Sequence, residues 1–177
     1  MPRWSVLTAV FDPEPEHLEA CLASVRSQTD ADLEHIVVDD RSTDPHVAEI
    51  LARAATDDPR VTVITRETNG GIVAASRDAL AAATGEYVAL LDHDDVLEPD
   101  ALEAMAAALA DADVAYSDHD LLLADGRPGP PYRKPDFSPE QLRNQNYVLH
   151  LLTARRAEIA AAGGFRDGFD GAQDLSL

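Results

Sequence analysis

The stretch Tyr87–Asp95, with the sequence YVALLDHDD, decides the fold of this chain. Its first residues, Tyr87–Leu91, are apolar throughout, and acidic side chains follow at once at Asp92, Asp94 and Asp95. A short, continuous apolar run is typical of a strand that is buried on both faces. The stretch therefore predicts a buried strand whose carboxyl end carries a group of carboxylates.

Three similar apolar runs precede this strand, and segments with helical spacing of apolar residues separate them. The expected strands are Trp4–Phe11, His35–Asp39 and Val61–Thr65. The expected helices include Leu18–Val25, Val47–Ala54, Ile72–Ala83 and Pro99–Leu109. Buried strands that alternate with helices of this length form βαβ units. We predict an α/β fold, with a mostly parallel central sheet and flanking helices.

The pattern changes after the fourth helix. We expect a fifth strand at Val114–Ser117, and a long loop at Asp125–Pro139 because this segment contains five prolines. A short helix at Ser138–Gln141, a strand at Val148–Ala154 and a helix at Arg156–Ala162 complete the prediction.

The chain is strongly acidic, with 33 Asp and Glu against 14 Lys and Arg in 177 residues, a formal charge of −19. Sequence-independent binding to nucleic acid or anionic lipid needs a basic surface, so we exclude a nucleic acid partner. The sequence contains no run of about 18 apolar residues, so we expect no transmembrane segment. The start, Met1–Trp4, lacks the apolar core of a secretory signal. We expect a single cytoplasmic domain.

The single cysteine, Cys21, excludes an internal disulfide and a zinc site built from several cysteines. It lies on one helical stripe with Leu18, Leu22 and Val25. We expect its side chain to be a small buried apolar group rather than a nucleophile.

Carboxylates follow several of the predicted strands. They are Asp12 after the first, Asp39 and Asp40 at the second, Asp92, Asp94 and Asp95 after the fourth, and Asp118 and Asp120 after the fifth. Ligands of open parallel sheets bind at the carboxyl ends of strands, where these acids are expected to converge. Crowded like charges are costly unless a cation neutralises them. Oxygen ligands of this kind suit Mg²⁺ or Mn²⁺, which keeps positions open for substrate phosphates.

Other sites that use carboxylates or phosphate-binding loops fit less well. An EF-hand starting at Asp92 would need Asp and Gly where Val96 and Leu97 stand. The glycines of a dinucleotide-binding turn do not follow the first strand, and no P-loop motif is present. A receiver domain would need a lysine on a late strand near the site, whereas the only lysine, Lys134, lies in the proline-rich loop.

Three features each allow two interpretations. The Asn-Gly-Gly turn at residues 69–71 presents backbone amides to a ligand, or it is an ordinary turn between strand and helix, which the sequence alone favours. Arg77 either reaches a diphosphate or pairs with Asp78 or Glu86. His150, inside an apolar run, is interpreted as a buried core histidine rather than a catalyst.

Four motifs follow one another along the chain. They are SVLTAVFDPEPEHLEACLASVRSQT, IVVDDRSTD, NGGIVAASRDALAAATGEYVALLDHDD and, at the end, GGFRDGFDGAQDLSL. Together they resemble the family 2 glycosyltransferases of the GT-A fold over essentially the whole chain. The segment from Tyr116 to His150 is similar to the branch that builds rhamnose-containing and O-antigen-type bacterial polysaccharides.

The resemblance implies a metal-dependent, inverting transfer of a sugar from a nucleotide-diphosphate donor to an acceptor hydroxyl on a saccharide or lipid-linked saccharide. It implies one GT-A domain over residues 1–177. Its nucleotide-binding half spans about residues 1–120, and about residues 121–177 begin an acceptor half that is truncated at its carboxyl end. The expected place is the cytoplasm or, for the full-length protein, the inner face of the membrane.

Residue roles on the nucleotide side follow the motifs. By resemblance, Asp39 binds the base and Ala9 contributes its backbone. Asn69 and Arg77 are further candidates for binding the nucleotide-sugar.

Residue roles at the reacting centre are implied in the same way. Asp92-His93-Asp94 corresponds to the family's DxD motif, in which Asp94 ligates the metal and Asp92 lies near the ribose or the metal. Asp174 corresponds to the base that takes the proton of the acceptor hydroxyl. Its alternative role is a helix N-cap.

The sequence also departs from the family pattern. The first strand ends in Ala9-Val10-Phe11, where the family commonly has Pro-x-Tyr, and Asp78 stands where the family has Asn. Because the chain stops three residues after Asp174, a second interpretation is a fragment that binds nucleotide and metal but lacks transfer activity.

Overall fold

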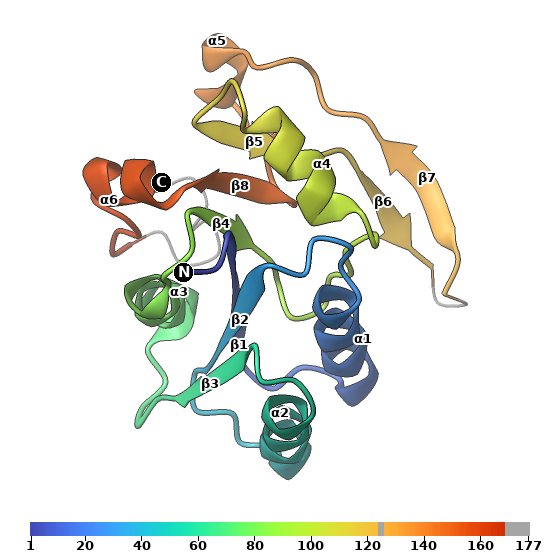
Figure 1. Ribbon diagram of the computed structural model, residues 1–177, viewed down its shortest axis with the longest axis vertical. Helices are drawn as coiled ribbons and strands as arrows, with labels where there is room; N and C mark the ends of the chain where they lie inside the picture. The colour runs from blue at the N-terminus through green and yellow to red at the C-terminus, as the bar shows by residue number, and fades with distance from the viewer. Residues whose placement is uncertain (124–125, 169–177) are drawn as a thin grey trace.

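The computed structural model describes residues 1–123 and 126–168. Its centre is a six-stranded sheet with the order β3-β2-β1-β4-β8-β5 (Figure 1). The strands β1 (Trp4–Val10), β2 (Leu33–Asp39), β3 (Val61–Thr65) and β4 (Tyr87–Leu90) are parallel neighbours. The four apolar runs therefore form one parallel sheet, and the predicted α/β class is confirmed.

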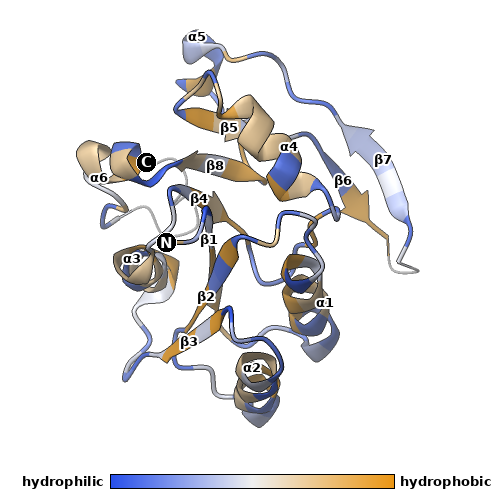
Figure 2. Ribbon diagram, in the orientation of Figure 1, coloured by the Kyte–Doolittle hydropathy of each residue, from blue (hydrophilic) through white to orange (hydrophobic). Residues whose placement is uncertain are grey.

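Helices cover both faces of this sheet. On one face lie α1 (Pro15–Arg26), α2 (Pro45–Asp57) and α4 (Ala101–Ala108), and on the other lie α3 (Gly71–Ala82) and α6 (Arg156–Ala162). Side chains alternate between the two faces along β1, as strand geometry requires. Accordingly, Val6 and Val10 pack in clusters with α1, whereas Leu7 packs in a cluster with α3. Figure 2 shows the apolar residues gathered on the sheet and on the helix surfaces that face it.

Cys21 lies in the layer between α1 and the sheet. Its side chain is fully buried, and its Sγ is 3.4 Å from the carbonyl oxygen of Asp92. Burial raises the pKa of the thiol to about 12, and the negative charge of Asp95 adds to this shift. The expected burial of Cys21 is confirmed.

The second half of the sheet is antiparallel. The strand β8 (Leu152–Arg155) runs antiparallel between β4 and β5 (Val114–Tyr116). The predicted strand Val148–Ala154 was therefore placed too early, because the chain bends before Leu152 and Leu149 has a φ of 39°. The residue pair Leu90 and Leu152 is in register across β4 and β8.

One strand of a small second sheet lies in the segment that was predicted to be a loop. The strand β7 (Pro128–Tyr132) pairs with β6 (His119–Leu122), so the prediction of a loop throughout Asp125–Pro139 is wrong. Proline removes a donor but is tolerated on edge strands, and both strands of a two-stranded sheet are edges. The short helix α5 (Pro139–Leu142) follows, capped by Ser138, whose Oγ accepts the N–H of Gln141 at 3.3 Å. Among the described residues, no helix has the length and apolar character needed to cross a membrane.

Candidate functional site

A pocket opens at the carboxyl ends of the parallel strands. Its volume is about 480 Å³. It is lined by Ala9–Phe11 at the end of β1, by Asn69 and Gly71 at the start of α3, by Asp92–Asp94 after β4, and by Asp40. The structure thus brings together Ala9, Asn69, Asp92 and Asp94, four of the residues that the sequence selected. Three carboxylates line the pocket, so an anionic ligand would enter a negatively charged surrounding unless a cation accompanies it.

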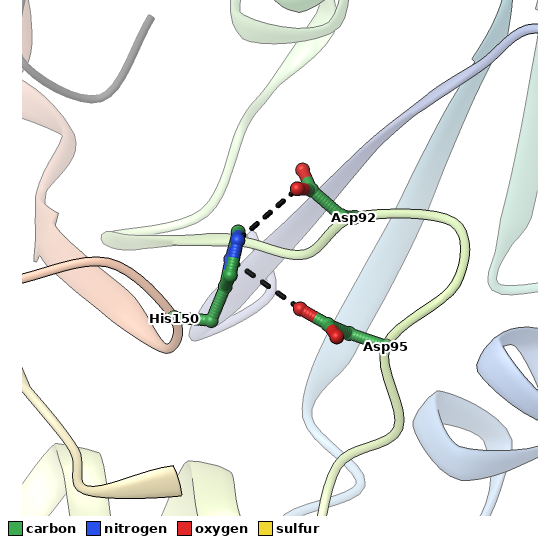
Figure 3. A group of neighbouring side chains, drawn as sticks. All are labelled: Asp92, Asp95 and His150. Atoms are coloured by element: carbon green, nitrogen blue, oxygen red, sulfur yellow. Dashed lines mark ion pairs between the residues drawn. The ribbon is translucent and has the colours of Figure 1, made fainter. Parts of the chain in front are cut away.

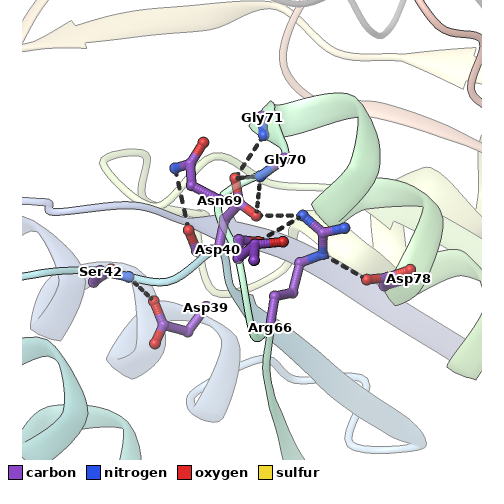
Figure 4. A network of polar contacts seen from close by, with 9 residues as sticks. Asp39, Asp40, Ser42, Arg66, Asn69, Gly70, Gly71 and Asp78 are labelled. Atoms are coloured by element: carbon purple, nitrogen blue, oxygen red, sulfur yellow. Dashed lines mark hydrogen bonds and ion pairs between the residues drawn. The ribbon is translucent and has the colours of Figure 1, made fainter.

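The two acids at the end of β2 have different surroundings (Figure 4). Asp39 is 6% exposed, and its Oδ1 accepts the backbone N–H of Ser42 at 2.9 Å. Asp40 is 3% exposed, and its Oδ2 accepts the N–H of Gly71 at 2.7 Å and that of Gly70 at 3.1 Å. The carboxylate of Asp40 therefore lies at the amino end of α3, where the partial positive charge of the helix is greatest.

The amides of the Asn-Gly-Gly turn are thus bound by the protein itself. Asn69 donates through Nδ2 to the carbonyl oxygen of Asp40 at 3.1 Å, which closes the turn from the other side. A Cβ at Gly70 would lie 2.3 Å from Nη1 of Arg66, so the guanidinium group that pairs with Asp40 would have to shift. Gly71 has a φ of 82°, which favours glycine. The interpretation as a turn that needs a positive φ therefore applies to Gly71, whereas Gly70 has a φ of −126°.

A second group of polar side chains lies beside the pocket (Figure 3). Nε2 of His150 is 3.1 Å from Oδ2 of Asp92, and Nδ1 is 3.5 Å from Oδ2 of Asp95. One ligand atom of each residue lies within 4.8 Å of the others, a separation that a metal ion could bridge. Burial raises the pKa of Asp95, because the charged carboxylate loses solvent there.

The sheet register explains this group. Leu90 and Leu152 pair across the antiparallel strands, so the segment that follows β4 and the segment that precedes β8 lie at the same end of this strand pair, where Asp92 meets His150. The interpretation of His150 as a buried core histidine is wrong, since its side chain is 38% exposed and faces two carboxylates. The same group contains Asp95, which the sequence placed at the strand end without a role. The sequence did not predict that β4 has an antiparallel neighbour, β8, and therefore did not predict that His150 lies near Asp92 and Asp95.

The other two residues of the DxD motif, His93 and Asp94, lie outside this group but line the pocket. Nδ1 of His93 is 3.1 Å from the carbonyl oxygen of Ala9, which ties the motif to the end of β1. Asp94 is exposed and lines the pocket.

Other strand-end acids have local structural partners. Asp12 accepts the N–H groups of Thr43 and Asp44, at 2.7 and 3.0 Å. Asp118 accepts from Arg133 and from the backbone of Lys134, at 2.9 and 2.8 Å. The expected convergence of carboxylates at the pocket therefore holds for Asp40, Asp92 and Asp94. Asp39 does not line the pocket, and Asp12 and Asp118 hold loops.

Arg77 has neither of the partners expected within the protein. Its Nη2 donates to Oδ1 of Asp167 at 2.6 Å and to the carbonyl oxygen of Phe165 at 3.3 Å. The expected pairing fails because Asp78 binds Arg66 at 2.7 Å and Glu86 binds Arg155 at 3.0 Å. Arg77 contacts the glycine-rich segment that leads towards Asp174, which itself lies outside the described residues.

Solved structures with the same architecture define the class. The mannosyltransferase PcManGT from Pyrobaculum calidifontis, in complex with GDP-Man and Mn²⁺, has a TM-score of 0.72 at 23% identity, covering 98% of this chain and 50% of that chain. TarS 1–349 of S. aureus, in complex with UDP-GlcNAc, has a TM-score of 0.75 at 23% identity, covering 98% of this chain and 51% of that chain. The fold is that of the GT-A glycosyltransferases.

Sequence relatives define the family. Residues 5–159 match the family described as Glycosyl transferase family 2. The O-antigen biosynthesis protein RfbC of Myxococcus xanthus is 45% identical over 179 residues, which is 99% of this chain and 14% of that protein. A chondroitin synthase of Pasteurella multocida (strain Pm70) is 32% identical over 172 residues, 91% of this chain and 17% of that protein. The chain belongs to glycosyl transferase family 2 and spans a small part of these relatives.

Proposed function

We propose that this domain transfers a sugar from a nucleotide-diphosphate donor to an acceptor hydroxyl, with inversion at the anomeric carbon, in the synthesis of a cell-surface polysaccharide. The observation that carries this proposal is the pocket whose rim holds Asp92 and Asp94 beside the group formed with Asp95 and His150. A carboxylate-lined pocket is suited to a diphosphate that arrives with a divalent cation. Fold neighbours that hold GDP-Man with Mn²⁺ and UDP-GlcNAc support this ligand class.

The nucleotide would lie against the ends of β1 and β2. Ala9 offers its backbone beside the pocket, and Asp39 has one carboxylate oxygen engaged by Ser42, leaving the second to accept an N–H of the base. Asn69 lines the same pocket. Arg77 would bind the donor diphosphate by exchanging its exposed partner Asp167 for a phosphate oxygen.

A bound Mg²⁺ or Mn²⁺ would be held by Asp92 and Asp94, with Asp95 and His150 as further donors. The carboxylate oxygens suit both ions. When bound, the metal supplies positive charge to the diphosphate leaving group. The contribution of the protein is to hold the carboxylates at the pocket, where Asp92 already lies between the pocket and His150.

Proton removal from the acceptor is assigned to Asp174. A carboxylate near the acceptor hydroxyl takes its proton as the oxygen attacks the anomeric carbon from the side opposite the diphosphate. Attack from that side inverts the configuration. We propose a saccharide or lipid-linked saccharide as the acceptor, because the relative named for O-antigen biosynthesis matches 99% of the chain.

We also propose the division of labour along the chain. About residues 1–120 would form the nucleotide-binding half, and about residues 121–177 would begin the acceptor half. A full-length protein acting on a lipid-linked acceptor would work at the inner face of the membrane.

The second candidate is a nucleotide- and metal-binding fragment without transfer activity. The observation that favours it is coverage, since the chain spans about half of the solved structures that share its fold. An acceptor site in the part of those structures that this chain does not cover would leave donor binding intact and transfer absent.

Calorimetry with UDP, GDP and dTDP, with and without Mn²⁺, tests both candidates. We expect Mn²⁺-dependent binding of at least one nucleotide, loss of that binding in Asp94→Asn, and retained binding in Asp174→Asn. Donor hydrolysis or transfer that disappears in Asp174→Asn would support the transferase, whereas binding without turnover would support the fragment. Absence of binding to every nucleotide, with metal present, would overturn both.

A further inference from the structure

We propose that Lys134 is the positioning residue that sets His150 against Asp92 and Asp95. The inference rests on the proposed metal site and adds a residue from outside the pocket to it. Lys134 is the only lysine of the chain and follows β7 in the proline-rich segment. The sequence analysis used Lys134 only as an argument against a receiver domain and gave it no role of its own.

The ammonium group of Lys134 binds the backbone on both sides of Leu149. Its Nζ donates to the carbonyl oxygen of Val148 and to that of His150. Hydrogen bonds from a charged donor are about twice as strong as neutral ones. The two bonds therefore fix the bend at Leu149, where the chain has a φ of 39°. This bend directs the imidazole of His150 towards the two carboxylates (Figure 3).

The segment that carries Lys134 is itself held in place. The backbone N–H of Lys134 donates to Oδ1 of Asp118 at 2.8 Å, and the carbonyl oxygen of Pro135 accepts the hydroxyl of Tyr116 at 2.8 Å. The Nζ also lies 5.9 Å from the centroid of the Tyr116 ring, within the range of a cation–π contact. Lys134 thus reaches His150 from a segment anchored at two adjacent residues, so its ammonium group has a defined position.

The opposite side of the bend is anchored to the end of β5. Leu151 donates its N–H to Oγ of Ser117 at 3.1 Å, and its carbonyl oxygen accepts the N–H of Ser117 at 3.1 Å. These bonds fix where the chain enters β8. The carbonyl oxygen of His150 is not part of them and accepts a hydrogen bond from Lys134 instead. Losing the ammonium group should therefore loosen the peptide that carries the imidazole while β8 stays paired.

The proposal can be separated from a general structural role. Lys134→Met removes the ammonium group but keeps much of the side-chain volume, and Lys134→Arg keeps a cation. Arg133→Met is the matched control, because Arg133 is the adjacent residue and binds Asp118 without contacting the bend at Leu149. His150→Gln removes the imidazole that Lys134 is proposed to place.

The measurement is Mn²⁺ affinity in the presence of UDP or GDP, followed by the electron paramagnetic resonance signal of free Mn²⁺. We expect Lys134→Met to weaken Mn²⁺ binding about tenfold and His150→Gln to weaken it by a similar factor. The double variant should bind no more weakly than His150→Gln, because both changes act through the same imidazole. Arg133→Met should stay within about twofold of the unmodified chain, and Lys134→Arg should recover part of the loss.

If Lys134→Met fails to fold, reductive dimethylation of the folded chain replaces it. Dimethyl-lysine keeps its charge but has one N–H, so it cannot bond to both carbonyl oxygens. Dimethylation should weaken Mn²⁺ binding in the unmodified sequence but not in Lys134→Arg, in which only the terminal amine reacts.

Two results would overturn the inference while leaving the proposed function intact. One is unchanged Mn²⁺ affinity in both Lys134→Met and the dimethylated chain. The other is a double variant whose loss equals the product of the single losses, which would mean that Lys134 does not act through His150. If the unmodified chain binds no Mn²⁺ with either nucleotide, the proposed metal-dependent function fails first and the inference fails with it.

Discussion

Arg66 and Asp40 form an ion pair at the amino end of α3, with Nη1 2.6 Å from Oδ1 and the side chain of Asp40 only 4% exposed. The Asp40 carboxylate also accepts the first N–H groups of the helix, so it occupies the position where many α/β proteins bind a phosphate. The amino end of α3 is therefore not open to a donor diphosphate, whose negative charge would need another positive partner. A cation held by the carboxylates after β4 would be that partner.

Removing this carboxylate should destabilise the fold. In Asp40→Ala, Arg66 loses its buried partner and the amides of Gly70 and Gly71 lose their acceptor. We expect the free energy of unfolding to fall by about 3 kcal/mol, as for other broken buried pairs. Urea denaturation measures it. The control is Asp78→Ala, which removes the more exposed partner of Arg66 and should cost less than about 1 kcal/mol. Equal losses would contradict the role given to Asp40.

Asp95 should oppose folding when no metal is present. Burial and the neighbouring charges of Asp92 and Asp94 raise its pKa, so the ionised carboxylate at neutral pH is less favourable in the folded chain than in the unfolded one. We expect Asp95→Asn to unfold at a higher urea concentration than the unmodified chain in a chelating buffer. With Mn²⁺ and UDP the order should reverse, since the variant lacks a proposed metal donor. Identical midpoints under both conditions would argue against a metal role for Asp95.

Arg77 should be able to exchange partners. Its ion pair with Asp167 is exposed, with side chains 47% and 89% accessible, and such pairs contribute little stability. We expect Arg77→Ala to weaken nucleotide diphosphate binding about tenfold, or ~1.4 kcal/mol. Asp167→Ala should leave that affinity unchanged or slightly increase it, because it releases the guanidinium. Calorimetry of both variants checks this. Similar losses in the two would mean that Arg77 acts by holding the loop instead.

His35 should make stability depend on pH. The ring is fully buried in β2 with Nε2 3.0 Å from Oγ1 of Thr8, and burial lowers its pKa from 6.5 to about 4. Between these values the unfolded chain binds the proton more tightly, so stability falls as the pH is lowered through the unfolded pKa.

We expect this residue to account for a loss of about 2 kcal/mol between about pH 7 and about pH 5. Urea denaturation is measured at both pH values for the unmodified chain and for His35→Gln. The difference between the two proteins separates the contribution of His35 from that of the other titrating groups. An equal pH dependence in the two proteins would contradict it.

The parallel half of the fold could be predicted because its signals are local. Each of the strands β1 to β4 contains a short run of mainly apolar residues, and each following helix has its own apolar stripe. For the antiparallel half, strands were expected near β5 and β8, but their pairing could not be predicted because it joins residues far apart in the chain. The prolines of β7 also mimic a loop, since nothing in composition distinguishes an edge strand from an extended connection.

The candidate site divides in the same way. Asn69, Asp92 and Asp94 were selected at strand and helix ends and Ala9 by the family resemblance, and all four line the pocket. His150 was predicted to be buried because it lies in an apolar run, which normally indicates burial. The structure starts β8 only at Leu152, so His150 precedes the strand and contacts Asp92. Asp174 stays a prediction from the family motif.

The insertion of β8 between β4 and β5 has a consequence for the order of folding. During synthesis, β4 and β5 both emerge before β8, and each then has an edge that only β8 occupies in the sheet. Such unpaired edges promote association between nascent chains. When β8 enters, the same step carries His150 to Asp92, so the last event in building the sheet is also the event that assembles the candidate site. Competence to bind metal would then report that this domain has finished folding.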